Sequence, residues 1–483
     1  MSTMTDRRLA AGCMLGSYDG TDVPQWLLER VGEGLGGVLL FAQNIVDDAQ
    51  VAEACGALRA ARDDVVIAID EEGGDVTRLD ASHGSDTPCP AAFGAVDDVQ
   101  LTFGAFADLG RRVKSLGIDL TLAPCADINS NPLNPIIGLR SFGTTADVVS
   151  RHVAAAVQGF RSSGLTACVK HYPGHGDTSA DTHLGPARIT ASIEALTARE
   201  LAPFAAAITA GVDAVLTAHI VVDALDSAPA SLSARWTDHL RRTTGFDGAI
   251  VTDALDMDAV AQGRGLAGVA DAAVLALAAG SDLLCVGSNF DASMTDTVVE
   301  AVTAALADGR LDRAALRRSC ERNIALRRAP VDATLSSSCA SSFVAAHAVT
   351  VTGVLPDGPF AVLECRPRAS IVCFNVKWGI ADQLAGRGWP TATIGEGDPI
   401  GDTCDALLSA AVQLPVVVVV RDAGVHPWQA SVVEHCRRVR PALVVAEMGW
   451  PQRNQQGPTT IVTHGAARSS AQALIDRLVV KES

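Results

Sequence analysis

Residues 165–183, LTACVKHYPGHGDTSADTH, decide how the rest of this chain is organised. The first five residues are short, apolar and partly β-branched, which is the pattern of a buried strand. The fourteen residues that follow carry three histidines, one lysine and two aspartates, together with two glycines and a proline. A strand that ends in such a titratable, turn-rich loop is typical of a loop held in place for chemistry. The alternative is a solvated surface loop.

Six further apolar runs occur before residue 290, and polar residues follow each of them within a few positions. Polar residues at the carboxyl ends of successive strands predict a (β/α)8 TIM-type barrel, because an open doubly wound sheet would collect them at one crevice. The runs are 37–41, 65–69, 118–122, 214–217, 249–252 and 283–286, and the polar residues that follow include Gln43, Asp70, Asp127, His219, Asp253 and Asn289.

A helical stretch, 297–328, closes this part of the chain, and a polar segment with a run of three serines follows it. We therefore expect a barrel domain at 1–328, a linker at 329–342 and a second domain at 343–483. Apolar runs and helical stretches alternate again in the second domain, which predicts a smaller α/β sandwich of the flavodoxin-like kind. Its expected strands are 360–363, 370–374, 416–420, 443–446 and 460–463.

The composition is that of a folded protein, since 48% of the residues are hydrophobic and only 19% are charged. The net charge of −17 and the lack of a basic cluster argue against nucleic acid and anionic membranes as partners. No run reaches the roughly 18 apolar residues that span a bilayer, and the apolar run at 9–14 is too short for a secretion signal. The twelve scattered cysteines form no CxxC, so we expect reduced, buried thiols in a cytoplasmic protein.

Asp181 and His183 form the sharpest candidate pair. Residues two apart in an extended segment point to the same side, so the carboxylate can bind the imidazole. Such a contact fixes the tautomer and raises the proton affinity of His183, which suits a general acid and base. The alternative is a contact that only stiffens the loop.

Asp253 is the second catalytic candidate, because it directly follows the apolar run 249–252 and precedes a helix-like stretch. A carboxylate at this position stays ionised and can be aimed at a substrate carbon as a nucleophile. The alternative is an aspartate that only caps the following helix.

Five further residues are candidates for binding rather than reaction. Asp70 with Arg78, and Lys170 with His171, offer the charged donors and acceptors that a polyhydroxylated ligand needs. Arg140 lies in a loop marked by a glycine and could bind an anionic or carbonyl-bearing substituent.

A metal site is the rival interpretation, since His171, His175, Asp181 and His183 could form a coordination shell. Hydrolytic metal barrels usually carry HxH after the first strand, whereas the first predicted strand here is followed by Gln-Asn. Neither HxH nor HExxH occurs anywhere in the chain. We therefore predict a site without a metal and without any other cofactor.

These residues lie in segments that resemble glycoside hydrolase family 3, specifically its β-N-acetylglucosaminidase branch. KHYPGHGDTSADTH (170–183) matches the long signature of that branch nearly throughout, and the other segments occur in the family's order. The resemblance covers the barrel and, more loosely, the C-terminal domain. The segments are GGVLLFAQN (36–44), AIDEEGGDVTRL (68–79), APCADINSNPLNPIIGLRSFG (123–143), TAHIVVDALDSAPASLS (217–233), IVTDALDM (250–257), VVVVVRDA (416–423) and ALVVAEMGWP (442–451).

The resemblance implies a retaining exo-β-N-acetylglucosaminidase that forms a covalent glycosyl-enzyme. Asp253 corresponds to the nucleophile, and His183, oriented by Asp181, corresponds to an unusual histidine acid/base. The resemblance also implies cis peptide bonds near Lys170–His171 and Tyr172–Pro173. The positions that correspond to residues holding the terminal GlcNAc are Asp70, Arg78, Arg140, Lys170 and His171.

The implied substrate is a small GlcNAc-containing carbohydrate, from a muropeptide or from chito-oligosaccharides. Histidine carries no negative charge in either protonation state, so His183 would repel an anionic leaving group or acceptor less than a glutamate. A phosphorylase using the same site is therefore an alternative, and a non-catalytic sugar-binding protein is another. Asp75 and Ala254 depart from the family's usual residues, which affects the expectation for specificity beyond the terminal sugar.

Overall fold

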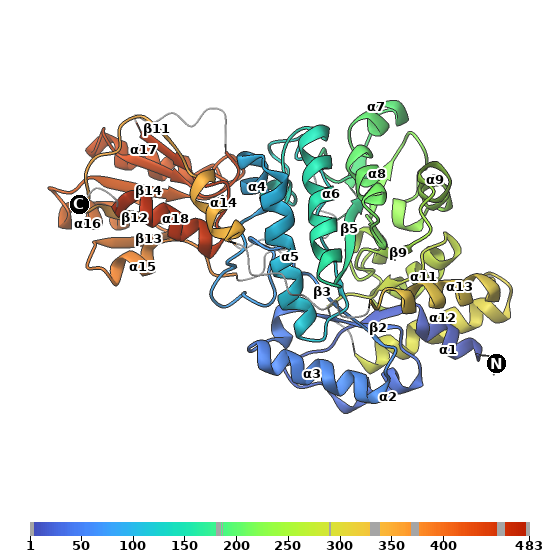
Figure 1. Ribbon diagram of the computed structural model, residues 1–483. Coiled ribbons are helices and arrows are strands. Elements are labelled where there is room, and N and C mark those ends of the chain that lie inside the picture. The colour runs from blue at the N-terminus through green and yellow to red at the C-terminus, as the bar shows by residue number, and fades with distance from the viewer. Residues whose placement is uncertain are drawn as a thin grey trace. The chain divides into compact units, whose positions relative to one another are not determined.

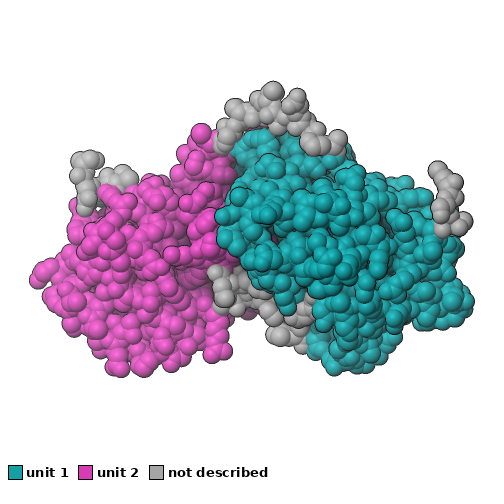
Figure 2. Space-filling view, turned by 90° about the horizontal axis from the view of Figure 1, so that it is seen from below, with its two compact units in different colours: residues 1–72, 102–130, 144–337 teal, residues 73–101, 131–143, 338–483 magenta. Residues whose placement is uncertain are grey.

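The computed structural model describes residues 4–179, 185, 187–288, 291–328, 339–368, 376–451 and 459–479. The chain divides into two compact units, drawn in teal and magenta in Figure 2. The first unit comprises residues 1–72, 102–130 and 144–337, and the second comprises 73–101, 131–143 and 338–483. The second unit thus contains two segments that lie within the sequence of the barrel.

Eight parallel strands form the barrel of the first unit (Figure 1). Their order is β10-β1-β2-β3-β4-β5-β7-β9, and a bridge between Val251 and Leu283 brings the two edges of the sheet together. The strands are β1 Met14–Gly16, β2 Gly37–Leu40, β3 Val66–Ile69, β4 Leu120–Thr121, β5 Thr166–Tyr172, β7 Ala214–Thr217, β9 Ala249–Thr252 and β10 Leu284–Cys285.

Every residue of these eight strands is buried, as expected when side chains fill the barrel and helices cover its outside. A small parallel sheet of β6 (Ala187–Ile189) and β8 (Ile220–Val222) lies apart from the barrel sheet. The helices are α1 Asp6–Gly12, α2 Gln25–Glu33, α3 Asp48–Ala61, α5 Val99–Ser115, α6 Ala146–Ser162, α7 Ile193–Ala198, α8 Ala202–Thr209, α9 Ala234–Thr244, α10 Asp258–Ala261, α11 Gly265–Ala278, α12 Ala292–Ala307 and α13 Arg313–Ala325.

The predicted barrel is confirmed, and all seven expected runs contain barrel strands. The eighth strand, β1, was not predicted, because its three residues continue an apolar stretch that begins in helix α1. The strand followed by Gln-Asn is therefore the second strand and not the first. Ser-Tyr-Asp follows the true first strand, and this sequence also lacks HxH.

The second unit is built on a six-stranded sheet with the order β11-β16-β15-β14-β12-β13. All neighbouring strands are parallel except β11, which pairs antiparallel with β16. Without β11 the order corresponds to the flavodoxin-like 2-1-3-4-5, which confirms the predicted sandwich. The elements are α4 Pro90–Val96, α14 Ala340–Ala348, β11 Thr350–Thr352, β12 Ala361–Arg366, α15 Ala381–Ala385, β13 Thr391–Gly395, α16 Ile400–Ala410, β14 Val416–Val420, α17 Trp428–Val439, β15 Val444–Glu447, β16 Thr459–Val462 and α18 Arg468–Val479.

Strand β14 shows why this sheet is covered on both faces. Its five valines are all buried, and alternate residues point to opposite faces of a strand. Val417 and Val419 belong to a core cluster that includes Leu474 of α18. Val418 belongs to a second cluster with Leu407 of α16. The continuous apolar strand β14 is therefore explained by a three-layer sandwich, in which helices cover both faces of the sheet.

The compact units differ from the predicted ranges, which treated the barrel domain as continuous to residue 328. Segments 73–101 and 131–143 group with the sandwich, since helix α4 packs against α14 and against the turn at Gly138–Arg140. A Cβ on Gly94 would lie 1.6 Å from the carbonyl oxygen of Phe142, so these two segments touch through backbone. The amino-acid composition of segments 73–101 and 131–143 does not indicate that they group with the second unit.

Two smaller differences concern the C-terminal half. Strands β11 and β13 were not predicted, and the expected strand 370–374 lies outside the described residues. Helix α14 begins at Ala340, so the last three residues of the predicted linker are helical, while 329–338 lie outside the described residues.

Ten of the eleven cysteines in the described ranges are buried and none of the eleven forms a disulfide, whereas Cys339 is exposed. Among the described helices, none combines the length and the apolar character needed to cross a membrane.

Candidate active site

Lys170, near the end of β5, is bound to two carboxylates. Its side chain is 4% exposed, and Nζ forms ion pairs with Asp70 and, at 2.6 Å, with Oε1 of Glu72. Both acids follow β3, and the carboxylate of Asp70 is 18% exposed while that of Glu72 is 1% exposed. A buried ammonium needs such partners to remain charged. The cluster therefore presents a fixed set of charged donors and acceptors at the carboxyl ends of β3 and β5.

His171 is oriented by a buried carboxylate from the loop after β4. Nδ1 of His171 lies 2.6 Å from Oδ2 of Asp127, whose side chain is fully buried. Asp127 also accepts hydrogen bonds from the backbone N–H groups of His171 and His175, the latter at 2.7 Å. The positive charge of His171 and these donors hold the pKa of Asp127 well below its usual range, against the opposing effect of burial. A ring bound through Nδ1 to a carboxylate can present only Nε2 to a ligand.

His175 is a structural residue of the same loop. Burial, together with the positive charge of His171, lowers its pKa to about 4, so the ring is neutral near pH 7. Its Nδ1 lies 2.7 Å from the hydroxyl oxygen of Thr178. At Gly176 a Cβ would lie 1.6 Å from the carbonyl oxygen of Ile128, which requires glycine. The Pro-Gly-His-Gly turn therefore shapes the loop, and the peptide bonds at Lys170–His171 and Tyr172–Pro173 are cis, as expected.

Asp253 directly follows β9 and is partly exposed. Its backbone N–H donates to the carbonyl oxygen of Thr217, and its Oδ1 accepts from the N–H of Ala254. Nε2 of His219 lies 2.8 Å from the carbonyl oxygen of Ala254, which further fixes this turn. Helix α10 begins only at Asp258, so the interpretation of Asp253 as a helix cap is wrong. The carboxylate is held by backbone at a strand end, in a position that suits a nucleophile.

The carboxylates of Asp253 and Asp70 both affect the pKa of one barrel residue, Cys285. The pKa of the Cys285 thiol, on β10, is raised well above its usual value by burial and by both carboxylates. Asp253 also acts electrostatically on His175. Asp70 and Asp253, at the ends of β3 and β9, thus both lie close enough to Cys285 of β10 to affect it.

Four further residues were predicted for the site: Arg78, Arg140, Asp181 and His183. Arg78 and Arg140 are buried and belong to the second unit, where Nη1 of Arg140 donates to the carbonyl oxygen of Ile136. Asp181 and His183 lie outside the described residues. The roles assigned to all eight predicted site residues stay predictions.

Three buried acids of this site were not chosen from the sequence. Glu72 and Asp127 follow predicted strands, so the rule that finds Asp70 could have found them. Glu200 follows helix α7 and carries no comparable signal. Burial raises the pKa of Glu200 to about 7, although Nε of Arg199 lies 2.6 Å from Oε1. The side chain of Glu200 also packs so closely against Gly174 that a Cβ on that glycine would collide with it. Glu200 therefore supports the turn after β5.

One group among the described residues has the composition of a metal site. Single ligand atoms of Cys125, Asp127 and His171 lie within 4.8 Å of one another. However, Asp127 already accepts from two backbone N–H groups, from the ring of His171 and from the thiol of Cys125. A cation would have to displace these donors. The residues fit a hydrogen-bonded support for His171 better than a metal ion, and metal-free action stays a prediction.

A family model and two curated relatives match this chain and agree on the same class of protein. The family model described as "Glycosyl hydrolase family 3 N terminal domain" matches residues 21–326. A beta-hexosaminidase of Xylella fastidiosa (strain M23) is 36% identical over 269 residues, which are 54% of this chain and 78% of that protein. Beta-hexosaminidase A of Pseudoalteromonas piscicida is 36% identical over 262 residues, which are 49% of this chain and 44% of that protein. The chain thus spans less than half of the Pseudoalteromonas relative.

Among solved structures, a glycoside hydrolase family 3 beta-N-acetylglucosaminidase from Paenibacillus sp. str. FPU-7 is similar over both units. The match has a TM-score of 0.88 and 31% identity, and it covers 100% of this chain and 98% of that chain. A beta-N-acetylhexosaminidase from Beutenbergia cavernae matches 67% of this chain with 30% identity and a TM-score of 0.61.

Proposed function

The chain belongs to glycosyl hydrolase family 3, and from that premise we propose that it is a retaining exo-β-N-acetylglucosaminidase. The observation that carries the proposal is the charge group at the barrel's strand ends, in which Lys170 binds Asp70 and Glu72 while Asp253 follows β9. Glycoside cleavage with retention needs a carboxylate nucleophile next to groups that hold the sugar's hydroxyls. The match to a beta-N-acetylglucosaminidase over the full chain supports the substrate class.

In the proposed mechanism, Asp253 attacks the anomeric carbon of a terminal β-linked GlcNAc and forms a covalent glycosyl-enzyme. His183, oriented by Asp181, donates a proton to the leaving oxygen and then takes a proton from the attacking water. Asp70, Lys170 and His171 hold the sugar through its polar groups. The substrate is a muropeptide or chito-oligosaccharide fragment, and we place the reaction in the cytoplasm because the sequence indicates reduced thiols.

The first test identifies the reaction product. The protein is incubated with a chromogenic β-GlcNAc glycoside, with and without phosphate, and the released sugar is analysed. Free GlcNAc at an unchanged rate is expected. GlcNAc-1-phosphate as the main product would instead establish the phosphorylase alternative, which is possible because His183 carries no negative charge in either protonation state. Binding of GlcNAc without turnover would establish a sugar-binding protein.

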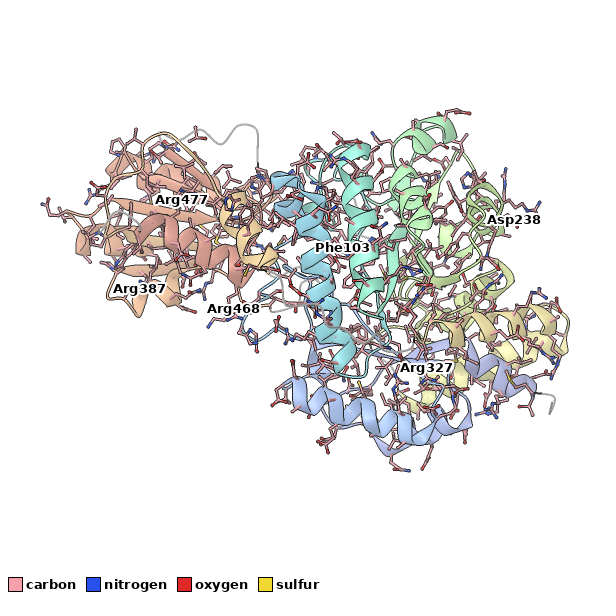
Figure 3. The ribbon with its side chains drawn as sticks, in the orientation of Figure 1. Phe103, Asp238, Arg327, Arg387, Arg468 and Arg477 are labelled. Atoms are coloured by element: carbon pink, nitrogen blue, oxygen red, sulfur yellow. The ribbon has the colours of Figure 1, made fainter. Side chains whose placement is uncertain are left out.

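The second test addresses the nucleophile. Asp253→Asn should lower kcat/KM by a factor of about 10³ or more, because the covalent step loses its attacking group. Asp238→Asn is the matched control, since this side chain is 60% exposed on α9 and is labelled in Figure 3. Full activity of Asp253→Asn alongside the control would refute the assigned role.

A further inference from the structure

The second unit contains a pocket of about 400 Å³ whose lining residues all belong to that unit. Much of its wall comes from the segments that directly follow β12 and β14, and Trp450 adds to it beyond β15. Strands β13 and β14 lie on opposite sides of β12, so the strand order reverses here. In open parallel sheets, ligands bind outside the carboxyl ends of the strands at this switch point. The pocket therefore lies where such a fold binds small molecules.

Three cations that line the pocket have carboxylate contacts that are mostly long. Nε of Arg366 binds the buried Glu364 at 2.8 Å, while Nη2 shares Asp382 with Lys377 at 3.6 and 3.7 Å respectively. The side chain of Arg368 is 85% exposed, and its carboxylate contact is as long as 3.7 Å. Long, shared pairs at the surface contribute little, so these groups remain able to bind an anion.

The floor of the pocket combines a buried cation with aromatic surface. Arg421 is 14% exposed, pairs with Asp75 at 2.8 Å and lies over the ring of Trp378 at 5.1 Å. Burial raises the pKa of Asp75, although the positive charge of Arg421 acts to lower it. Asp75 therefore ionises less readily than an ordinary aspartate. Trp450 also lines the pocket. Aromatic rings offer flat apolar surface, which suits the C–H faces of a pyranose, while the surrounding charges suit its polar groups.

The charge of the pocket differs from that of the chain. Three aspartates line it, against the five Arg and Lys residues Arg140, Arg366, Arg368, Lys377 and Arg421, whereas the whole chain has a net charge of −17. We propose that this pocket binds a sugar that carries an anionic group, either a carboxylate or a phosphate. The volume fits one sugar unit, at the lower end of ordinary ligand pockets. Arg140 is also assigned to holding the terminal GlcNAc in the proposed hydrolysis, whereas the other four cations have no role in that reaction.

The test measures sugar binding by the full chain with isothermal titration calorimetry. N-acetylmuramic acid and GlcNAc-6-phosphate are the charged probes, and GlcNAc is the neutral one. We expect both charged sugars to bind at least about tenfold more tightly than GlcNAc, and the tighter of the two identifies the anion. The double variant R368Q/K377Q should lose about tenfold or more in affinity for them.

The matched control is R387Q/R477Q, which removes the same charge from two exposed positions of the same unit that do not line the pocket (Figure 3). This control should bind the charged sugars as the unaltered protein does. Equal affinity for charged and neutral sugars, or equal losses in both double variants, would overturn the proposal.

Turnover separates this inference from the proposed function. R368Q/K377Q should hydrolyse a neutral chromogenic β-GlcNAc glycoside at the unaltered rate. A protein that binds charged sugars as described but does not cleave the glycoside would refute the proposed function and leave this site established.

Discussion

The strand ends of the barrel and those of the sandwich both carry buried carboxylates, but the donors that bind them differ. In the barrel, Glu72 is bound by the side-chain ammonium of Lys170. In the sandwich, Glu364 accepts from the backbone N–H groups of Ile380 and Ala381 at 2.7 and 2.9 Å, in addition to its pair with Arg366. Glu447 likewise accepts from backbone N–H groups, including that of Gly449 at 2.7 Å. The barrel carboxylate is paired with a cation of the proposed binding group, whereas the two sandwich carboxylates also fix backbone turns.

The largest expected effect is on the barrel's cation. Lys170→Met leaves the carboxylates of Asp70 and Glu72 without their ammonium partner, so these side chains no longer hold the geometry that binds the sugar. The value of kcat/KM should therefore fall by a factor of about 10³. Lys377→Met, at the sandwich pocket, is the matched control and should leave cleavage of a neutral glycoside unchanged. Equal effects of the two changes on kcat/KM would remove the distinction between the two regions.

A second comparison exchanges one acid in each region for its amide. Glu72→Gln should lower kcat/KM by about tenfold to a hundredfold with little change in unfolding, because its partner is part of the binding group. Glu364→Gln should lower the free energy of unfolding by about 1–3 kcal/mol and leave kcat unchanged, since it weakens bonds to backbone. Chemical denaturation and steady-state kinetics on both variants check this. The reverse assignment of effects would contradict it.

The pH dependence of His175 supplies a third measurement. Its pKa is depressed to about 4 in the folded state, so the unfolded chain binds a proton first as pH falls below about 6.5. The resulting stability is full above pH 6.5 and is lost as pH falls toward 4. In His175→Asn this part of the loss, about 3 kcal/mol, should be absent from denaturation curves measured between pH 7 and 4. An unchanged pH profile in the variant would contradict the prediction.

Glu447 should act in the opposite direction, because burial raises its pKa although backbone N–H donors lower it. Its pKa is raised to about 8 in the folded state, mainly by burial, so the folded chain binds a proton that the unfolded chain releases above about pH 4.5. Stability from this group is therefore lost as pH rises from 4.5 to 8. Glu447→Gln should gain stability relative to the unaltered protein as pH rises from 5 to 8, whereas the exposed Glu300→Gln should not.

Much of the barrel was predictable because its strands are buried on both faces and end in polar residues. The three-residue β1 was missed since its apolar run is continuous with helix α1. Asp70, Lys170 and His171 were chosen as candidates by their place at strand ends, and the same rule applied to every acid would have added Glu72 and Asp127. The support from Glu200 depends on a contact with a residue 26 positions earlier, Gly174, which no local pattern encodes.

The excursion at 73–101 has a consequence for how this chain can be divided. Helix α4 buries Pro90, Ala91, Ala92 and Phe93, and it packs against α14, which lies beyond the serine-rich segment. A protein truncated within the serine-rich segment would keep α4 but lose α14, and the apolar face of α4 would then be exposed to solvent. The barrel sequence thus carries a part of its neighbour's core, so this chain must be expressed as one piece for α4 to stay covered.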